Sequence, residues 1–364
     1  MAGAGTSPDI PLFDLVMTDE DLAAVEHVIR GGQLAAGSEV EAFERAFCTL
    51  LDCRHAVAVS NCTAALHLAY LAAGIGEGDE VIVPSITFAA TAAAAIYCGA
   101  TPVFADVVGP HDLGIDVDDV AAKITERTKA VCAVHYGGYP AAVDRLRDLC
   151  AERGVVLFED VAHAPLADLG GKALGTFGLA GCFSFFSNKV LAVGEGGLVC
   201  TDSQEVATRV RRDRDALAYG FDEPRAALLR SRMSRLPEDV AARQALTMRY
   251  RSELAGLEGI VVPYRDEDVA HSSCYVMPLV LTDLGRQSAV RAHMREHHGV
   301  QTSLLYPAVH QFTAYVERYG EQSVLNAERI ARTEVTVPLF PHMTHEQQDR
   351  VVVALRDALE AVPA

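Results

Sequence analysis

The sequence predicts an α/β protein with a large domain built on a mostly parallel sheet, followed by a smaller α+β domain. Short apolar runs alternate with helical segments over roughly residues 40 to 216. These runs are almost continuously Val, Ile and Phe, and glycines close several of the units. Strands of a parallel sheet have this composition because helices bury both of its faces.

Seven strands are expected in the large domain, at residues 55–60, 80–85, 101–107, 129–135, 155–163, 181–187 and 196–201. Helices are expected between them, at residues 63–74, 88–99, 116–125, 140–154 and 203–218. The last third predicts helices near 238–257, 286–299 and 344–362 and extended segments at 259–264, 274–283 and 300–307. Ser, Thr or Asp precedes several helices, as N-caps do. We therefore expect an N-terminal arm (1–16), a large domain (17–245) and a small C-terminal domain (246–364).

Composition excludes several classes of protein. The net charge of -18 argues against a nucleic-acid binder, which normally has a basic face. The nine cysteines include no CxxC pair and fit a reducing cytoplasm. The N-terminus lacks the pattern of a signal peptide, and the most apolar stretch, residues 88–105, is broken by Gly99 and Pro102, so no membrane span is expected. The arginine-rich segment 209–236 is either a solvated helix face or a phosphate-facing region.

An anion site is suggested where "SNCTAALHLA" turns from a strand into a helix. Ser60, Asn61 and Thr63 stand at this turn. The free N–H groups and the dipole of a helix N-terminus attract negative charge. The same residues also fit an ordinary helix cap, so the signal is weak by itself.

Two neighbouring strand ends carry ionisable groups. Asp160 ends the apolar strand of "LFEDVAHA", with His163 three residues later, and Ser184 and Lys189 follow the next apolar run. Ligands of open α/β sheets collect at the carboxyl ends of strands. A desolvated lysine there can act as an amine nucleophile toward aldehydes. The structural alternatives are a capping Asp160, a packed His163 and a Lys189 that extends to the surface.

Two further motifs are weaker. The "GEGG" turn (194–197) permits close backbone approach but is not a phosphate loop of the Walker type, and Glu195 is either a site residue or a surface charge. His293 and His297 in "HMREHH" have helical zinc-like spacing but lack the HExxH order, so no metal site is expected.

Together these features describe a site for an aldehyde cofactor that needs an amine, a carboxylate under a ring nitrogen and an anion cradle. Pyridoxal phosphate is such a cofactor.

The chain resembles the DegT/DnrJ/StrS family of fold-type I pyridoxal-phosphate aminotransferases, from "IPLFD" at residue 10 to "QQDRVVVALRDAL" near 359. The motifs that carry the resemblance are "GGQLAAGSEVEAFERAF", "SNCTAALHLA", "DEVIVPSITFAAT", "FEDVAHA", "SFFSNKVLAVGEGG" and "LYPAVH". It implies an aspartate-aminotransferase-like fold and a homodimer with active sites at its interface.

The resemblance also implies roles for individual residues. Lys189 would hold the cofactor and move protons, Asp160 would keep its ring nitrogen protonated, and His163 would lie near its phenolate oxygen. The phosphate would be bound by Cys62, Thr63, Ala64 and Ser184, and Phe88 would stack on the ring. Tyr306 and His310 correspond to a segment lining the family's substrate cleft, although a structural turn explains each of them equally well.

The sequence departs from the family pattern at three points. Cys62 replaces a common Gly, and Arg230 stands where the family has an Asn that reaches the partner subunit's phosphate. Arg230 is expected to serve that phosphate instead. The helix that follows is shortened, and Pro237 restricts its start.

The expected function is amino transfer from glutamate or glutamine to a keto group of a nucleotide-linked sugar, in amino-sugar or antibiotic biosynthesis. Three alternatives remain: a sugar dehydratase, which Lys189 argues against because the resembling branch has His there; an aminocyclitol or amino-shikimate-type enzyme; and a catalytically weak partner subunit.

Overall fold

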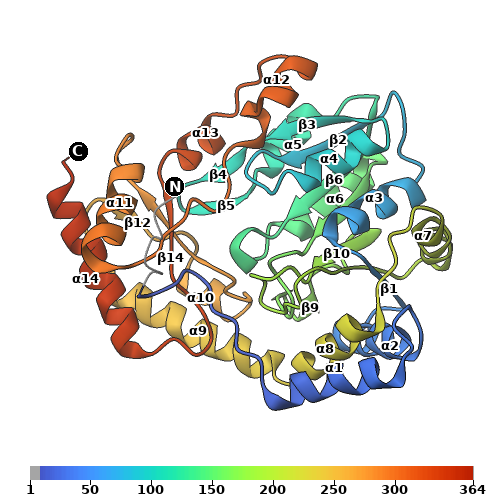
Figure 1. The fold of residues 1–364 in the computed structure, drawn as a ribbon. Helices are drawn as coiled ribbons and strands as arrows, with labels where there is room; N and C mark the ends of the chain where they lie inside the picture. The colour runs from blue at the N-terminus through green and yellow to red at the C-terminus, as the bar shows by residue number, and fades with distance from the viewer. Residues whose placement is uncertain (1–8, 364) are drawn as a thin grey trace, which may run out of the picture.

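The computed structural model describes residues 9–363, and its centre is a seven-stranded sheet (Figure 1). The strand order is β1 (His55–Val59), β11 (Gly197–Thr201), β10 (Ala180–Ser184), β7 (Val156–Asp160), β6 (Thr128–Val134), β2 (Glu80–Pro84) and β3 (Thr101–Ala105). Strand β11 is antiparallel to both neighbours, and all other pairs are parallel. This confirms the predicted mostly parallel α/β sheet.

Helices cover both faces of this sheet. One face packs against α3 (Cys62–Ala72), α4 (Ala90–Tyr97) and α7 (Gln204–Ala216), and the other against α2 (Ser38–Leu51), α5 (Val117–Lys123) and α6 (Val143–Arg153). Strand β1 shows the alternation: Val57 and Val59 join one apolar cluster, and Ala56 and Ala58 the other. Successive side chains of a strand point to opposite faces, so an almost wholly apolar strand feeds both cores.

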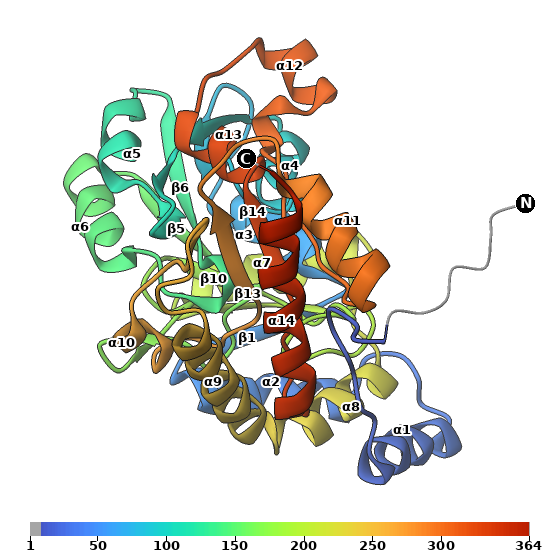
Figure 2. The same ribbon diagram turned by 90° about the vertical axis from the view of Figure 1, so that its left-hand side faces the viewer.

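A second layer is formed by the last third of the chain. Strands β12 (Ile260–Val261), β13 (Met277–Leu281) and β14 (Glu334–Val337) make a small antiparallel sheet. It packs with α9 (Leu236–Glu253), α11 (Gln287–His298) and α14 (His345–Ala361), the last two lying side by side (Figure 2). Helix α9 runs through the expected boundary at 245/246, so the division into domains stays a prediction. Part of the expected N-terminal arm, residues 1–8, lies outside the described residues.

The remaining elements connect these layers. They are α1 (Asp19–Gly31), α8 (Glu223–Met233), α10 (Asp266–Val269), α12 (Thr313–Tyr319), α13 (Leu325–Ala331), two 3-10 turns (Tyr136–Gly138 and Val309–Gln311) and the hairpins β4–β5 (Val107–Gly109, Asp112–Ile115) and β8–β9 (Asp168–Leu169, Lys172–Ala173). Within residues 9–363, no helix combines the length and apolarity needed to cross a membrane.

Several expected extended segments differ from the structure; β10, for example, ends at Ser184 and not at residue 187. Strand β7 stops at Asp160 and not at residue 163, because the Asp160 carboxylate accepts the N–H of Ala162 and turns the chain. Segment 300–307 forms isolated bridges only, such as Ser303 with Thr336. The segment was expected to be extended, and it joins no sheet as a strand.

Helix α2 depends on a carboxylate from a distant segment. Its N-cap is Gly37, which has no side chain to satisfy the first N–H groups. Glu223, at the start of α8 and 3% exposed, supplies the acceptor. Its carboxylate accepts the N–H groups of Gly37, Glu39 and Val40 at 2.8, 3.0 and 2.9 Å.

Replacing Glu223 by Ala removes these acceptors and leaves buried N–H groups without partners. We expect Glu223→Ala to lower the free energy of unfolding by about 2–4 kcal/mol, the range for a lost buried charged acceptor. Urea denaturation measures the difference. Glu346→Ala, at an exposed position in the first turn of α14, is the control and should change stability by less than about 0.5 kcal/mol. Equal effects of the two substitutions would contradict this account of α2.

Candidate active site

A cavity of about 360 Å³ lies at the edge of the sheet where the parallel strands end. Asp160 is the last residue of β7, Ser184 is the last of β10, and Asn61 lies two residues after the end of β1. Parallel strands bring their carboxyl ends to one edge, so side chains distant in sequence meet there. The lining residues are Asn61, Cys62, Thr63, Thr87, Phe88, Ala90, Val134, Asp160, Ala162, His163, Ser184, Phe186, Asn188, Lys189, Glu195 and Tyr306.

Asp160 lies at the base of this cavity and is 5% exposed. Its carboxylate accepts the hydroxyl of Thr91 at 2.8 Å and the N–H of Ala162 at 3.1 Å. Burial raises the pKa of Asp160, although these bonds and the charge of Lys189 act in the opposite direction. The hydrogen bonds and charges within the protein therefore do not fully stabilise the ionised form of Asp160.

The carboxylate of the neighbouring Glu159 differs from that of Asp160 in its hydrogen-bond partners. Glu159 points to the other face of β7, and its carboxylate accepts the N–H groups of Gly175, Phe177 and Gly178 at 2.7 to 2.9 Å. His135 contributes a fourth contact at 3.1 Å. Glu159 is thus held entirely by protein groups, whereas Asp160 keeps acceptor capacity toward the cavity.

Lys189 borders the same cavity and does not extend away from the site. Its Nζ lies 4.6 Å from the centre of the Tyr275 ring. Burial lowers the pKa of Lys189 to about 8, and the nearby Asp160 and Cys62 only partly oppose this. The neutral, nucleophilic form of the amine is therefore much more populated near physiological pH than in an ordinary lysine.

His163 is coupled to Tyr306. The N–H of Gly137 points at His163 Nδ1 (3.4 Å), so the ring proton resides on Nε2, which donates to the Tyr306 hydroxyl at 2.8 Å. The His163 ring also stacks on Tyr275, with centroids 4.6 Å apart. Burial and the charge of Lys189 hold the pKa of His163 well below its ordinary value, so the ring is neutral.

The anion side of the cavity is the N-terminus of α3. The Asn61 side chain caps this helix by accepting a hydrogen bond from the Ala64 N–H at 2.9 Å. This N–H was expected to bind phosphate, but it already has a partner. Ala64 itself does not line the cavity, whereas Cys62, Thr63 and Ser184 do. A Cβ on Gly197 would lie 2.4 Å from the Asn61 carbonyl, so only glycine lets β11 approach this turn.

Two expected site residues lie elsewhere. Arg230 on α8 forms an ion pair with Glu39 and borders a separate surface hollow. His310 is 2% exposed and contacts the Ser85 hydroxyl and, at 3.4 Å, Glu328. Its neighbour in the motif, Tyr306, does line the cavity, because the chain turns between the two residues.

The arginine-rich segment 209–236 is largely engaged within the chain. The ion pairs join Arg209 to Glu205, Arg212 to Asp213, Arg214 to Glu44, Arg225 to Asp222, Arg230 to Glu39 and Arg235 to Asp21. This favours the structural interpretation of the segment over a phosphate-facing one.

Sequence reasoning missed three residues of the site. Thr91 holds Asp160, Tyr275 underlies Lys189, and Asn188 lines the cavity with a buried Oδ1 that has no partner among the described residues. Thr91 interrupts the alanine run of helix α4, which was a usable signal. Tyr275 carries no local signal, because its position depends on the packing of the small sheet.

The residues present fit pyridoxal phosphate. A nucleophilic amine, an incompletely compensated buried carboxylate and a capped helix N-terminus face one cavity, with Phe88 (58% exposed) at its border. The buried Asn188 Oδ1, which has no hydrogen-bond partner among the described residues, adds a polar group that a ligand can contact. Each group matches a different part of the cofactor.

Comparison with known proteins agrees with this assignment. The model of the DegT/DnrJ/EryC1/StrS aminotransferase family matches residues 16–356. The dTDP-3-amino-3,4,6-trideoxy-alpha-D-glucose transaminase of Streptomyces venezuelae is 36% identical, over 100% of this chain and 99% of its own length. The spore coat polysaccharide biosynthesis protein SpsC of Bacillus subtilis is 32% identical, over 94% of this chain and 95% of its own.

Solved structures give the same result. The aminotransferase DesV of S. venezuelae, solved with a ketimine intermediate, has a TM-score of 0.91 at 35% identity and is matched over 98% of this chain and 100% of its own. The aminotransferase TlmJ of Streptoalloteichus hindustanus has a TM-score of 0.89 at 34% identity, over 97% of this chain and 99% of its own. The fold is therefore that of these aminotransferases.

The low pKa of Lys189 predicts the pH dependence of its reactivity. Acetylation of the cofactor-free protein by acetic anhydride requires the neutral amine, so labelling of Lys189 should rise with pH and be half-maximal near pH 8. An ordinary lysine reaches this point at about 10.4. Asp160→Asn removes a charge that raises this pKa, so the midpoint should move lower. Peptide mass spectrometry measures the labelling, and a midpoint above 10 would exclude a desolvated Lys189.

Proposed function

Because the chain belongs to the DegT/DnrJ/EryC1/StrS aminotransferase family, we propose that it transfers an amino group from an amino acid to the keto group of a nucleotide-linked sugar. It is a pyridoxal-phosphate-dependent transaminase, as the family is. The names of its relatives support a sugar acceptor. The observation that carries the proposal is the placement of Lys189 and Asp160 at one cavity beside the N-terminus of α3.

When bound, the cofactor supplies an aldehyde that reacts with amines and a ring that withdraws electrons from the adjacent carbon. Lys189 Nζ would bind the aldehyde and later take a proton from the donor's α-carbon and return one during amino transfer. Its desolvation favours both roles, because a base with a pKa near the working pH is efficient in both directions.

Asp160 would hold the protonated ring nitrogen. The bonds from Thr91 and Ala162 fix the carboxylate, and a cation in the cavity would supply the compensation that the protein lacks. The neutral His163 would donate through Nε2 and keep the Tyr306 hydroxyl oriented, so that its O–H can donate toward the phenolate oxygen.

The remaining roles follow from position. Thr63 and Cys62 on the first turn of α3, with Ser184, would bind the phosphate, and Phe88 would stack on the ring. Glu195 and Tyr306 border the cavity and would contact substrate. Ala64 and His310 would not contact the cofactor or the substrate. The Ala64 N–H would hold the Asn61 cap of α3, and His310 would hold the hydroxyl of Ser85.

The donor is glutamate or glutamine, and the product belongs to amino-sugar or natural-product biosynthesis. A homodimer is part of the proposal. It is supported by exposed apolar side chains along the N-terminal segment, among them Val16, Leu22 and Ile29. Nine free cysteines support a cytoplasmic location.

A second candidate is amination of a cyclitol or shikimate-type ketone. The structure of 3-amino-5-hydroxybenzoic acid (AHBA) synthase has a TM-score of 0.88 and 27% identity to this chain. The name of that protein gives an aminated hydroxybenzoic acid and no sugar, which supports the second candidate, and only an assay of acceptors separates the two candidates.

The deciding experiment is the visible absorbance of the purified protein before and after L-glutamate. We expect a yellow protein that bleaches with the donor and regains its colour with a nucleotide-linked keto sugar. Recovery with keto-cyclitols alone would establish the second candidate. A protein that stays colourless after added pyridoxal phosphate would refute both proposals.

Replacing Lys189 by Ala removes both the amine and the base. We expect Lys189→Ala to lower amino transfer by roughly 100- to 10,000-fold or more, the usual contribution of an acid–base group. The assay is 2-oxoglutarate formation from L-glutamate. Lys172→Ala is the control, because Lys172 is exposed and contacts Phe177. A Lys189→Ala variant with normal transfer would disprove the role of Lys189.

Replacing Asp160 by Asn keeps the size of the side chain and removes its charge. We expect Asp160→Asn to lower the transfer rate by roughly 100- to 1000-fold, the effect of losing a preorganised electrostatic contact. The readout is the single-turnover rate with L-glutamate. Glu346→Gln neutralises an exposed carboxylate outside the cavity and should retain the donor reaction. A rate near wild type for Asp160→Asn would rule out the proposed ring contact.

A further inference from the structure

We propose that His293, His298 and Asp357, on the small-domain helices α11 and α14, bind a divalent transition-metal ion, with zinc as the best fit. The site lies outside the cavity at Lys189 and is independent of the proposed function. It was not expected from the sequence, which offered His293 and His297 as the only helical pair.

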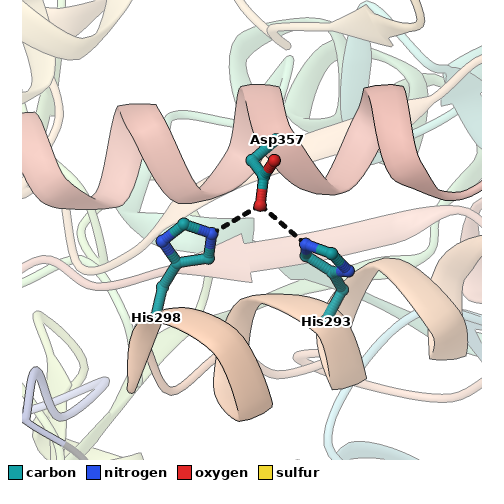
Figure 3. Close-up of side chains that lie close together, drawn as sticks. All are labelled: His293, His298 and Asp357. Carbon is teal, nitrogen blue, oxygen red and sulfur yellow. Dashed lines mark hydrogen bonds and ion pairs between the residues drawn. The ribbon is translucent and has the colours of Figure 1, made fainter.

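The three side chains converge on one point (Figure 3). His293 Nε2 lies 2.8 Å from Asp357 Oδ2, and His298 Nε2 lies 2.7 Å from the same oxygen. The ligand atoms of all three lie within 4.8 Å of one another. The histidine side chains are 17% and 25% exposed and Asp357 is 50% exposed, so an ion can enter from solvent.

The end of α11 explains why His298 takes part. Residues five apart do not share a face of a regular helix. His298 is the last residue of α11, and Gly299, with a φ of 65°, ends the helix in the left-handed conformation. Val290 and Met294 pack α11 against α14 within the small-domain core, which brings Asp357 opposite both imidazoles.

The donor set matches zinc. Two imidazole nitrogens and one carboxylate oxygen, with a further position left to water, form a known type of tetrahedral site. Within residues 9–363, Asp357 forms no ion pair with a lysine or arginine. The C-terminal end of α11 also favours a cation.

Direct binding tests the site. The holoenzyme, purified without a histidine tag and treated with a chelator, is dialysed against Zn²⁺, and bound metal is measured by mass spectrometry. We expect one ion per chain at this site and a rise in melting temperature with zinc, because the ion joins α11 to α14. In His293→Gln/His298→Gln the affinity should fall at least about tenfold, since even residues that only orient ligands contribute about 10- to 100-fold.

Two further variants complete the test. Asp357→Asn keeps an oxygen that accepts hydrogen bonds from the histidines, so this variant is expected to fold. It should nevertheless lose the zinc-dependent rise in melting temperature. His271→Gln/His342→Gln removes two histidines from other His–Asp pairs, with Asp168 and Asp14, and should bind as wild type does. Absence of stoichiometric zinc in the wild type, or equal binding in His293→Gln/His298→Gln, would overturn the proposal.

Discussion

The site depends on two buried groups of opposite charge, Lys189 and Asp160, that face one cavity. Burial acts against the charged form of each: it lowers the pKa of the amine and raises that of the carboxyl. Each charge is attracted by the other, yet neither is fully compensated. A ligand with an aldehyde, a basic ring nitrogen and a phosphate can react with the amine of Lys189 and place a cation beside the carboxylate of Asp160. This is why the cofactor fits the cavity.

The fold supplies that arrangement through the parallel sheet. Strands β7 and β10 end side by side, and α3 starts next to them after β1. Glu159 and Asp160 are adjacent in β7, yet their carboxylates have different roles. Adjacent residues point to opposite faces, so one carboxylate is satisfied by backbone N–H groups and the other is left for the ligand.

Long-range polar contacts hold the surrounding elements in place. Glu223 provides the N-terminal acceptors for α2, and Asp21 pairs with Arg235. Long-range ion pairs also engage Arg214 with Glu44 and Arg230 with Glu39. The same kind of convergence, between α11 and α14, creates the histidine–aspartate cluster of the small domain. Each case joins residues more than fifty positions apart in the sequence.

The sequence by itself determined the α/β class and the mostly parallel sheet, and it offered Lys189, Asp160, His163, Ser184 and Thr63 as candidate site residues, because almost continuous apolar runs and strand-end polar residues are local signals. Only the tertiary structure decided the rest. It removed His310 from the cavity, occupied the Ala64 N–H with Asn61, and brought Thr91, Tyr275 and Asp357 to their partners. These outcomes depend on helix packing and on the hydrogen bonds that buried groups must satisfy, which no single stretch of sequence encodes.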